Sequence, residues 1–147
     1  MQLNRLDHLV LTVRDIDSTV AFYELVLGMQ KVIFKGGRVA LAFGKQKINL
    51  HQLGKEFEPK AMNTKCGSAD LCFIMDTSLD KAIAHLQKCE IHILEGPIER
   101  TGALGKIISI YVRDPDGNLI ELSNYEKCIT TSDNKHQNKE KYSLPLK

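Results

Sequence analysis

The order of strand-like and helix-like segments in this chain occurs twice, and this repeat constrains the fold more than any other feature. Each half contains runs of β-branched and aliphatic residues around one stretch of helical periodicity, which predicts a strand, a helix and three strands. The first set of segments is 6–13, 15–27, 30–34, 38–43 and 47–53. After a loop over 54–68, the second set is 69–75, 77–88, 91–94, 106–112 and 118–124, with a longer loop over 95–105. The pattern predicts an α+β chain of two tandem βαβββ modules, about 5–54 and 68–125.

The two halves can be registered on each other. Segment 8–11 aligns with 70–73 at an offset of 62 residues. Segment 49–51 aligns with 119–121 at an offset of 70, and the eight extra residues fit the longer second loop. The match is one of pattern rather than identity, and it indicates a duplication.

Residues typical of helix ends mark both helices. Asp15 or Asp17 is the expected N-cap of the first helix, and Gly28 follows its last residue. Thr77, with Asp80 three residues later, resembles a capping box at the start of the second helix.

The last strand carries one carboxylate, Glu121, between apolar neighbours. It follows a turn in which Pro115 presets φ and Gly117 tolerates a positive φ. Because side chains in a strand alternate between two faces, Glu121 lies on the face opposite Ile120 and Leu122. Burying an unpaired carboxylate is costly, so this strand predicts a partner for Glu121.

Three other polar residues occupy comparable places in apolar strands: His8, His51 and Asp70. In a curved sheet built from two modules, these faces can line a shared concavity together with Glu121. Two imidazoles and two carboxylates suit a divalent metal ion such as Zn²⁺, Ni²⁺, Mn²⁺ or Fe²⁺. We therefore predict a metal site of these four residues. In an alternative arrangement Asp70 bonds a loop backbone, and the remaining three form a two-histidine, one-carboxylate set.

Three motifs carry a resemblance to a known family. They are Leu6-Asp7-His8-Leu9-Val10-Leu11-Thr12-Val13, Phe22-Tyr23 with Leu27-Gly28, and Asp114-Pro115-Asp116-Gly117-Asn118-Leu119-Ile120-Glu121. Together they resemble the vicinal oxygen chelate superfamily, which includes glyoxalase I, fosfomycin-resistance proteins and extradiol dioxygenases. Segments 55–61 and 95–103 are similar to vertebrate-type glyoxalase domain-containing proteins. The resemblance covers about residues 5–125.

This resemblance implies a curved mixed sheet that forms a metal cup, with the helices on its outer face. The family takes its ligands from the first and last strand of each module, which are the positions of His8, His51, Asp70 and Glu121 in this chain. Two positions depart from the family pattern. The third ligand is usually a histidine rather than Asp70, and His51 stands where glyoxalase I carries a glutamate that binds metal and shuttles a proton.

The activity that this resemblance implies is that of a metal-dependent, glyoxalase-like lyase or isomerase. Its substrate would be a small carbonyl compound or its thiol adduct, with glutathione as a candidate cosubstrate. The metal would chelate vicinal oxygens and stabilise the enediolate formed when a proton leaves the adjacent carbon. Glu121 is the candidate base and His51 the alternative. Other hypotheses are a catalytically silent small-molecule-binding protein, a metal-dependent dioxygenase and a thiol transferase.

Composition argues against several kinds of partner. The net charge of the 147 residues is +2, and it resides in 126–147, which predicts a flexible polar tail after a charge-balanced domain. Nucleic acid and anionic membrane are therefore not expected partners. The four cysteines lack C-x-x-C spacing, and no apolar run has transmembrane length, so we expect a cytoplasmic or mitochondrial-matrix protein. Because the edges of small curved sheets favour pairing, we also expect a homodimer.

Overall fold

The computed structural model describes residues 1–126, and the predicted tail beyond Glu126 lies outside the described residues. Two βαβββ modules follow each other along the chain, as predicted. The first contains β1 (His8–Val13), α1 (Ile16–Leu27), β2 (Gln30–Phe34), a short 3₁₀ turn (Lys35–Gly37), β3 (Arg38–Phe43) and β4 (Gln46–Gln52). The second contains β5 (Asp70–Ile74), α2 (Leu79–Lys88), β6 (Glu95–Gly102), β7 (Gly105–Arg113) and β8 (Leu119–Tyr125).

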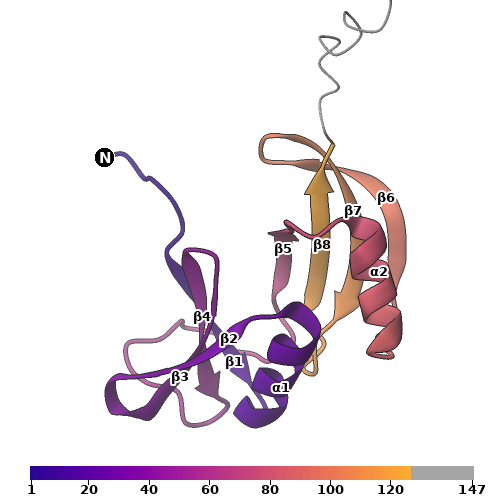
Figure 1. Cartoon of the computed structure of the whole chain (residues 1–147). Coiled ribbons are helices and arrows are strands. Elements are labelled where there is room, and N and C mark those ends of the chain that lie inside the picture. Colours follow the sequence, from indigo (N-terminus) through magenta and orange to yellow (C-terminus); the bar gives the residue numbers. More distant parts are fainter. Residues whose placement is uncertain (127–147) are drawn as a thin grey trace, which may run out of the picture.

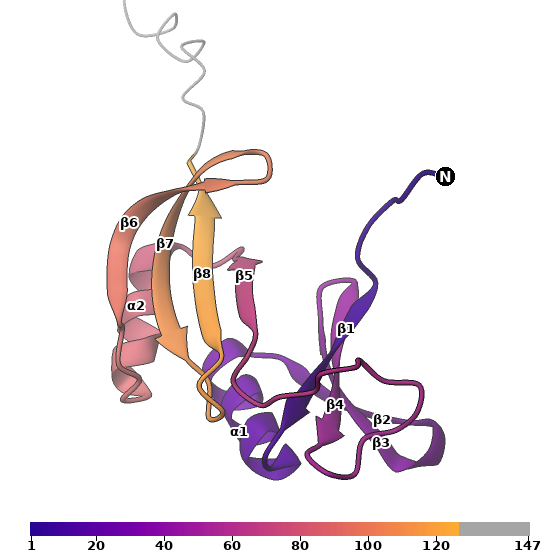
Figure 2. The ribbon, with the colours of Figure 1, turned by 180° about the vertical axis from the view of Figure 1, so that it is seen from behind.

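Each module forms its own four-stranded mixed sheet, with the orders β1-β4-β3-β2 and β5-β8-β7-β6. The first and last strand of each module pair in parallel, and the other pairs are antiparallel. Helix α2 covers one face of the second sheet and leaves the other face open (Figures 1 and 2). The α+β class is therefore confirmed, with the eight strands divided between two sheets. Among residues 1–126, no helix is both long and apolar enough to cross a membrane.

Helix α1 has the predicted ends and lies between the modules. Asp15 accepts a hydrogen bond from the backbone nitrogen of Ser18 at 2.7 Å, and Gly28 adopts the left-handed conformation at φ +67°. The buried face of α1 belongs to one apolar core that includes residues of both modules. This core includes Val20, Tyr23 and Val26 of α1, other residues of the first module (Leu11 and Leu50), and residues of the second module (Leu86, Ile110 and Ile120). The modules are thus held together by a shared core.

Two predictions for the second module are wrong. The N-cap of α2 is Ser78 rather than Thr77, and its side chain makes no capping hydrogen bond. The strand expected at 91–94 lies instead at Glu95–Gly102, within the segment predicted as a loop. This strand, β6, is at a sheet edge, where Pro97 needs no backbone donor and an irregular register between Glu95 and Ile98 is tolerated.

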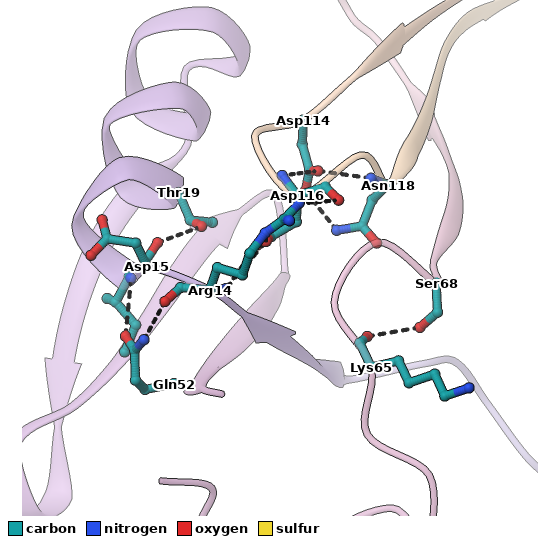
Figure 3. A network of polar contacts seen from close by, with 10 residues as sticks. Arg14, Asp15, Thr19, Gln52, Lys65, Ser68, Asp114, Asp116 and Asn118 are labelled. Atoms are coloured by element: carbon teal, nitrogen blue, oxygen red, sulfur yellow. Dashed lines mark hydrogen bonds and ion pairs between the residues drawn. The ribbon is translucent and has the colours of Figure 1, made fainter. Parts of the chain in front are cut away.

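The turn over 114–118 joins the two modules (Figure 3). One carboxylate oxygen of buried Asp114 accepts hydrogen bonds from the backbone nitrogens of Asp116 and Asn118, at 3.0 and 2.9 Å. The other accepts from the side-chain amide of Asn118 at 2.7 Å and from the hydroxyl of Tyr23 at 3.0 Å. The first module therefore supplies a donor to a carboxylate of the second.

Asp116 makes a second connection between the modules. Its carboxylate accepts from the backbone nitrogen of Arg14 at 3.2 Å and from the Nε of the same residue at 2.9 Å (Figure 3). The guanidinium also donates to the backbone oxygen of Asp116 at 3.1 Å. Only 3% of the Asp116 side chain is exposed, so this pair satisfies a buried charge.

Candidate functional site

The face of the first sheet opposite α1 carries the polar residues predicted from the first module. In the parallel β1–β4 pair, Val10 stands opposite Asn49 and Thr12 stands opposite His51. His8, at the start of β1, is therefore four residues away from His51 in register. At about 3.3 Å per residue, this separation is about 13 Å along the strands. The two histidines thus lie toward opposite ends of the strand pair.

The face of the second sheet opposite α2 carries the two predicted acids. In the β5–β8 pair, Cys72 stands opposite Glu121. Asp70 is two residues before Cys72, so the two carboxyl-bearing residues are about 7 Å apart along the strands. Ile120 and Leu122 are buried on the other face, as the alternation in the sequence predicts.

Each parallel strand pair begins with a corresponding backbone hydrogen bond, and these two bonds show which residues of the two modules are equivalent. Lys47 donates its backbone N–H to the oxygen of Asp7, and Leu119 donates its backbone N–H to the oxygen of Ala69. Asn49, two residues after Lys47, is therefore the counterpart of Glu121. The sequence alignment of His51 with Glu121 is wrong by two residues. A shift of two leaves every side chain on the same face, so apolar alternation does not detect it.

The partner of Glu121 within the chain is a serine. Ser109 on β7 donates its hydroxyl to Glu121 Oε1 at 2.6 Å. Ser123 lies 2.8 Å from the Ser109 hydroxyl, and the Cys72 thiol lies 3.5 Å from Ser123. Burial is the largest cause that raises the pKa of the Cys72 thiol. Glu121 is thus held by a short hydrogen bond, with two hydroxyl groups and a thiol beside it.

A second polar group lies beside Glu121. Tyr111 on β7 stands opposite Glu121, and its hydroxyl accepts a hydrogen bond from Arg100 Nε at 3.0 Å. Burial and the neighbouring Glu121 raise the pKa of Tyr111, while Arg100 opposes that rise. Tyr111 therefore keeps its proton near neutral pH. Sequence patterns did not indicate this residue, because its partner lies on the strand that was predicted as a loop.

His51 is enclosed by the connection between β4 and β5, which runs past β1 and β4 (Figure 2). Its side chain is 8% exposed, and its ring lies edge-on to Phe57 at a centroid distance of 5.5 Å. The Arg38 guanidinium lies 4.4 Å from the Phe57 ring centre. Burial, followed by the charge of Arg38, lowers the pKa of His51, so its imidazole is neutral at pH 7.

Two buried atoms in the first module have no hydrogen-bond partner among the described residues: Asn49 Oδ1 and His51 Nδ1. A cavity of about 500 Å³ adjoins His51, between the β1–β4 pair and the connecting segment, and its lining also includes Thr12 and Lys60. Buried polar atoms normally have partners, so an orphaned pair in one place is typical of a ligand site.

The four predicted metal ligands fall into two separate groups. His8 is exposed on the first sheet, with its Nδ1 2.8 Å from Asp7, and His51 lies farther along the same sheet. Asp70 and Glu121 lie on the second sheet. Across residues 1–126, no three His, Cys, Asp or Glu side chains are close enough to hold a metal ion. The described part of a single chain therefore keeps the four predicted ligands on two separate sheets.

Two βαβββ modules with polar residues on the free faces of their parallel strand pairs define a vicinal oxygen chelate fold. Sequence comparison assigns the family directly. The family model described as the Glyoxalase/Bleomycin resistance protein/Dioxygenase superfamily matches residues 5–122, and the chain belongs to this family.

Several relatives resemble the chain along most of its length. Virulence protein STM3117 of Salmonella typhimurium is 59% identical over 125 residues, covering 85% of this chain and 87% of that protein. Its crystal structure matches with a TM-score of 0.85 over 86% of this chain and 100% of that chain. Glyoxalase domain-containing protein RDO1 of Mycosarcoma maydis is 58% identical over 126 residues, covering 86% and 71%. The structure of Vibrio cholerae integron cassette protein VCH_CASS1 is 63% identical, with a TM-score of 0.84 over 86% of this chain and 98% of that chain.

Proposed function

We propose that this protein is a metal-dependent, glyoxalase-like lyase or isomerase whose site forms between two copies of the chain. Family membership supports metal-assisted chemistry on small oxygen-bearing substrates. A matched relative named methylmalonyl-CoA epimerase, 32% identical over 132 residues, supports the isomerase class. Another relative, 29% identical, is named a metallothiol transferase, which makes thiol transfer the second candidate.

The observation that carries this proposal is a repeated pair of residues. His8 and Asn49 in the first module have the same strand register as Asp70 and Glu121 in the second. Each pair lies on the sheet face away from its module's helix. We call each of these two residue pairs a half-site. A metal site shared between two modules requires one half-site from each module, with equivalent geometry.

A homodimer can bring these half-sites together. Strands β1 and β5 are at the edges of their sheets, with Val10 46% and Ile74 50% exposed on the polar faces. Exposed edge strands and apolar side chains are features that chain pairing buries. We propose that the first module of one chain faces the second module of its partner, which gives two equivalent sites per dimer.

The residues of the two half-sites suit a divalent ion. An imidazole from His8, carboxylates from Asp70 and Glu121, and an amide oxygen from Asn49 form a mixed N/O set typical of Zn²⁺, Ni²⁺, Mn²⁺ or Fe²⁺. Asn49 Oδ1 and His51 Nδ1 both lack a partner among the described residues, but only Asn49 has the strand register of Glu121, which supports Asn49 as the fourth ligand. His51 then remains available for proton transfer.

The proposed chemistry is proton transfer at a carbon next to a carbonyl group. A bound divalent ion would stabilise the negative charge that develops on the substrate oxygens. Glu121, oriented by Ser109, removes the proton, and the neutral imidazole of His51 is the alternative acceptor. Glutathione is the proposed cosubstrate if the substrate is a thiol adduct.

Metal titration of the purified, chelator-treated full chain tests this proposal. We expect about one ion per chain with Ni²⁺, Zn²⁺, Mn²⁺ or Fe²⁺ in calorimetry, and a loss of at least about tenfold in affinity for His8→Ala and Glu121→Ala. His92→Ala, at a histidine outside both half-sites, is the matched control. The loaded protein is then assayed with 2-oxoaldehydes, with and without glutathione. A wild-type chain that binds none of the four ions overturns the proposal.

A further inference from the structure

The open face of the second sheet contains a depression of about 390 Å³ next to Tyr111, the residue opposite Glu121 in the β7–β8 pair. Its lining residues are Asp70, Leu94, Glu95, Arg100, Tyr111 and Leu119. This volume is within the range of small-molecule sites. Leu94 and Leu119 supply apolar walls, and Arg100 is the single cation among these six residues. The depression therefore combines a short apolar surface with one guanidinium and two carboxylates, those of Asp70 and Glu95.

Arg100 is held in place from two sides. Its Nε donates to the Tyr111 hydroxyl at 3.0 Å, and its Nη1 donates to the backbone oxygen of Glu99 at 3.3 Å. These contacts fix the plane of the guanidinium before any ligand arrives. A guanidinium binds carboxylates through pairs of parallel N–H donors, and prior ordering reduces the entropic cost of binding.

A carboxylate of the protein itself already contacts this guanidinium. Glu95 Oε1 accepts from Arg100 Nη2 at 3.1 Å, and the two side chains are 53% and 36% exposed. Ion pairs that are exposed to this degree contribute little to stability. An incoming carboxylate can therefore replace Glu95 at small cost.

We infer that Arg100 and Tyr111 bind the carboxylate of a small 2-oxo acid, and that Glu95 competes for the same guanidinium edge. Leu94 and Leu119 contact the short aliphatic part of this ligand. Tyr111 stands opposite Glu121 in the β7–β8 pair, so the bound ligand lies on the same face of the sheet as the proposed base. This assignment rests on the proposed function, since it names the substrate class of the same site: anionic 2-oxo acids rather than uncharged aldehydes.

Ligand titrations of the full, metal-stripped chain test the assignment without relying on turnover. The probe is 2-oxopentanoate, the uncharged comparison is 2-pentanone, and the readout is the NMR shift of the Arg100 Nε–H group and nearby backbone amides. In Arg100→Gln, which lacks that group, the amides report binding. We expect Arg100→Gln to weaken 2-oxopentanoate binding at least about tenfold, which corresponds to one lost charge-assisted contact. Arg100→Lys, which keeps the charge without the planar fork, should weaken it less.

Two further variants separate recognition from general destabilisation. Lys106→Gln removes a cation that pairs with Glu99 at 2.8 Å on the same two strands but does not line the depression, so binding should be unchanged. Glu95→Gln removes the competing carboxylate and should tighten 2-oxopentanoate binding about two- to fivefold. A loss of a structural contact would not produce this gain.

The inference is overturned if wild-type protein fails to bind 2-oxopentanoate, or if 2-pentanone binds equally well. It is also overturned if Lys106→Gln weakens binding as much as Arg100→Gln, or if Glu95→Gln does not tighten it. A chain that binds nickel but not 2-oxopentanoate refutes the substrate class and leaves the metal-dependent function standing. A chain that binds 2-oxopentanoate but none of the four metal ions refutes the metal-dependent function and leaves the carboxylate site standing.

Discussion

Tyr23 donates its hydroxyl proton to Asp114 at 3.0 Å, and both side chains are buried. Tyr23 belongs to α1 of the first module, whereas Asp114 begins the turn before the last strand of the second. Burial, followed by the charge of Asp114, raises the pKa of Tyr23, so the donor keeps its proton throughout the neutral range. The turn that precedes Glu121 thus has a structural role in addition to orienting β8.

Tyr23→Phe should lower the free energy of unfolding by about 1–3 kcal/mol, because it removes a buried hydrogen bond to a charged group. Tyr125→Phe is the matched control, since that hydroxyl accepts a bond from the exposed backbone nitrogen of Leu104 at 3.1 Å. Urea denaturation of both variants measures the difference. Equal losses in the two variants would contradict a special role for the bond between the modules.

Substitutions of Asn49 and His51 should have different effects. If Asn49 supplies the fourth ligand, Asn49→Ala weakens metal binding at least about tenfold and Asn49→Asp strengthens it. His51→Gln then keeps a metal affinity within about threefold of wild type but lowers turnover. Calorimetry and steady-state kinetics on the same preparations give both quantities. If His51→Gln weakens metal binding and Asn49→Ala does not, His51 rather than Asn49 is the fourth ligand.

Mixed dimers should regain function if each site combines modules from two chains. His8→Ala and Glu121→Ala proteins, each defective alone, should recover about one quarter of wild-type metal sites after subunit exchange, because half of the dimers carry one intact site. Unfolding and refolding an equimolar mixture, followed by metal titration, tests this expectation. Sites that form within a single chain would show no recovery.

The stability of the protein should fall in acid partly through His51. The folded-state pKa of this residue lies below its ordinary value of 6.5, so the unfolded chain binds more protons just below that value. The contribution of His51 to the free energy of unfolding is therefore complete above about pH 6.5 and is lost as the pH falls below it. His51→Gln should show a shallower decrease between about pH 7 and pH 5. Parallel denaturation profiles for both proteins would refute this assignment.

Gly67→Ala should destabilise the protein more than Gly54→Ala. Both glycines have positive φ, at +69° and +78°, but a Cβ atom at Gly67 would lie 2.4 Å from the backbone oxygen of Asp116, and one at Gly54 would contact nothing. We expect an additional loss of about 1–3 kcal/mol for Gly67→Ala. Thermal or urea denaturation of the two variants measures it, and equal losses would show that the Asp116 loop moves aside.

The local periodicity of the sequence predicted most elements correctly, and its failures have physical causes. The helical spacing of apolar residues around Val20 and the terminating glycine Gly28 were sufficient to predict the bounds of α1, because both signals act within one helix. Strand β6 was missed because Gly96 and Pro97 are turn formers that an edge strand tolerates. His51 was aligned with Glu121 in place of Asn49 because alternation does not distinguish shifts of two residues.

Contacts between distant residues were also outside the reach of local patterns. Arg14 and Asp116 are 102 residues apart in the chain, and neither position indicates the other. The separation of the predicted ligands onto two sheets likewise depends on how the modules pack. Alternation therefore predicted the sheet faces on which His8, His51, Asp70 and Glu121 lie, but not the distances between these residues.

The long sequence separation of the contacts between modules has a consequence for folding kinetics. Strand pairing within the first module joins His8 to Lys47, whereas the Tyr23 and Arg14 bonds span 91 and 102 residues. Loop-closure entropy favours forming the nearer pairs first, so docking at the 114–118 turn comes late in folding. Substitutions at that turn should speed unfolding and leave the folding rate almost unchanged. We therefore expect the lifetime of the folded chain to depend on the contacts at the junction of its two modules.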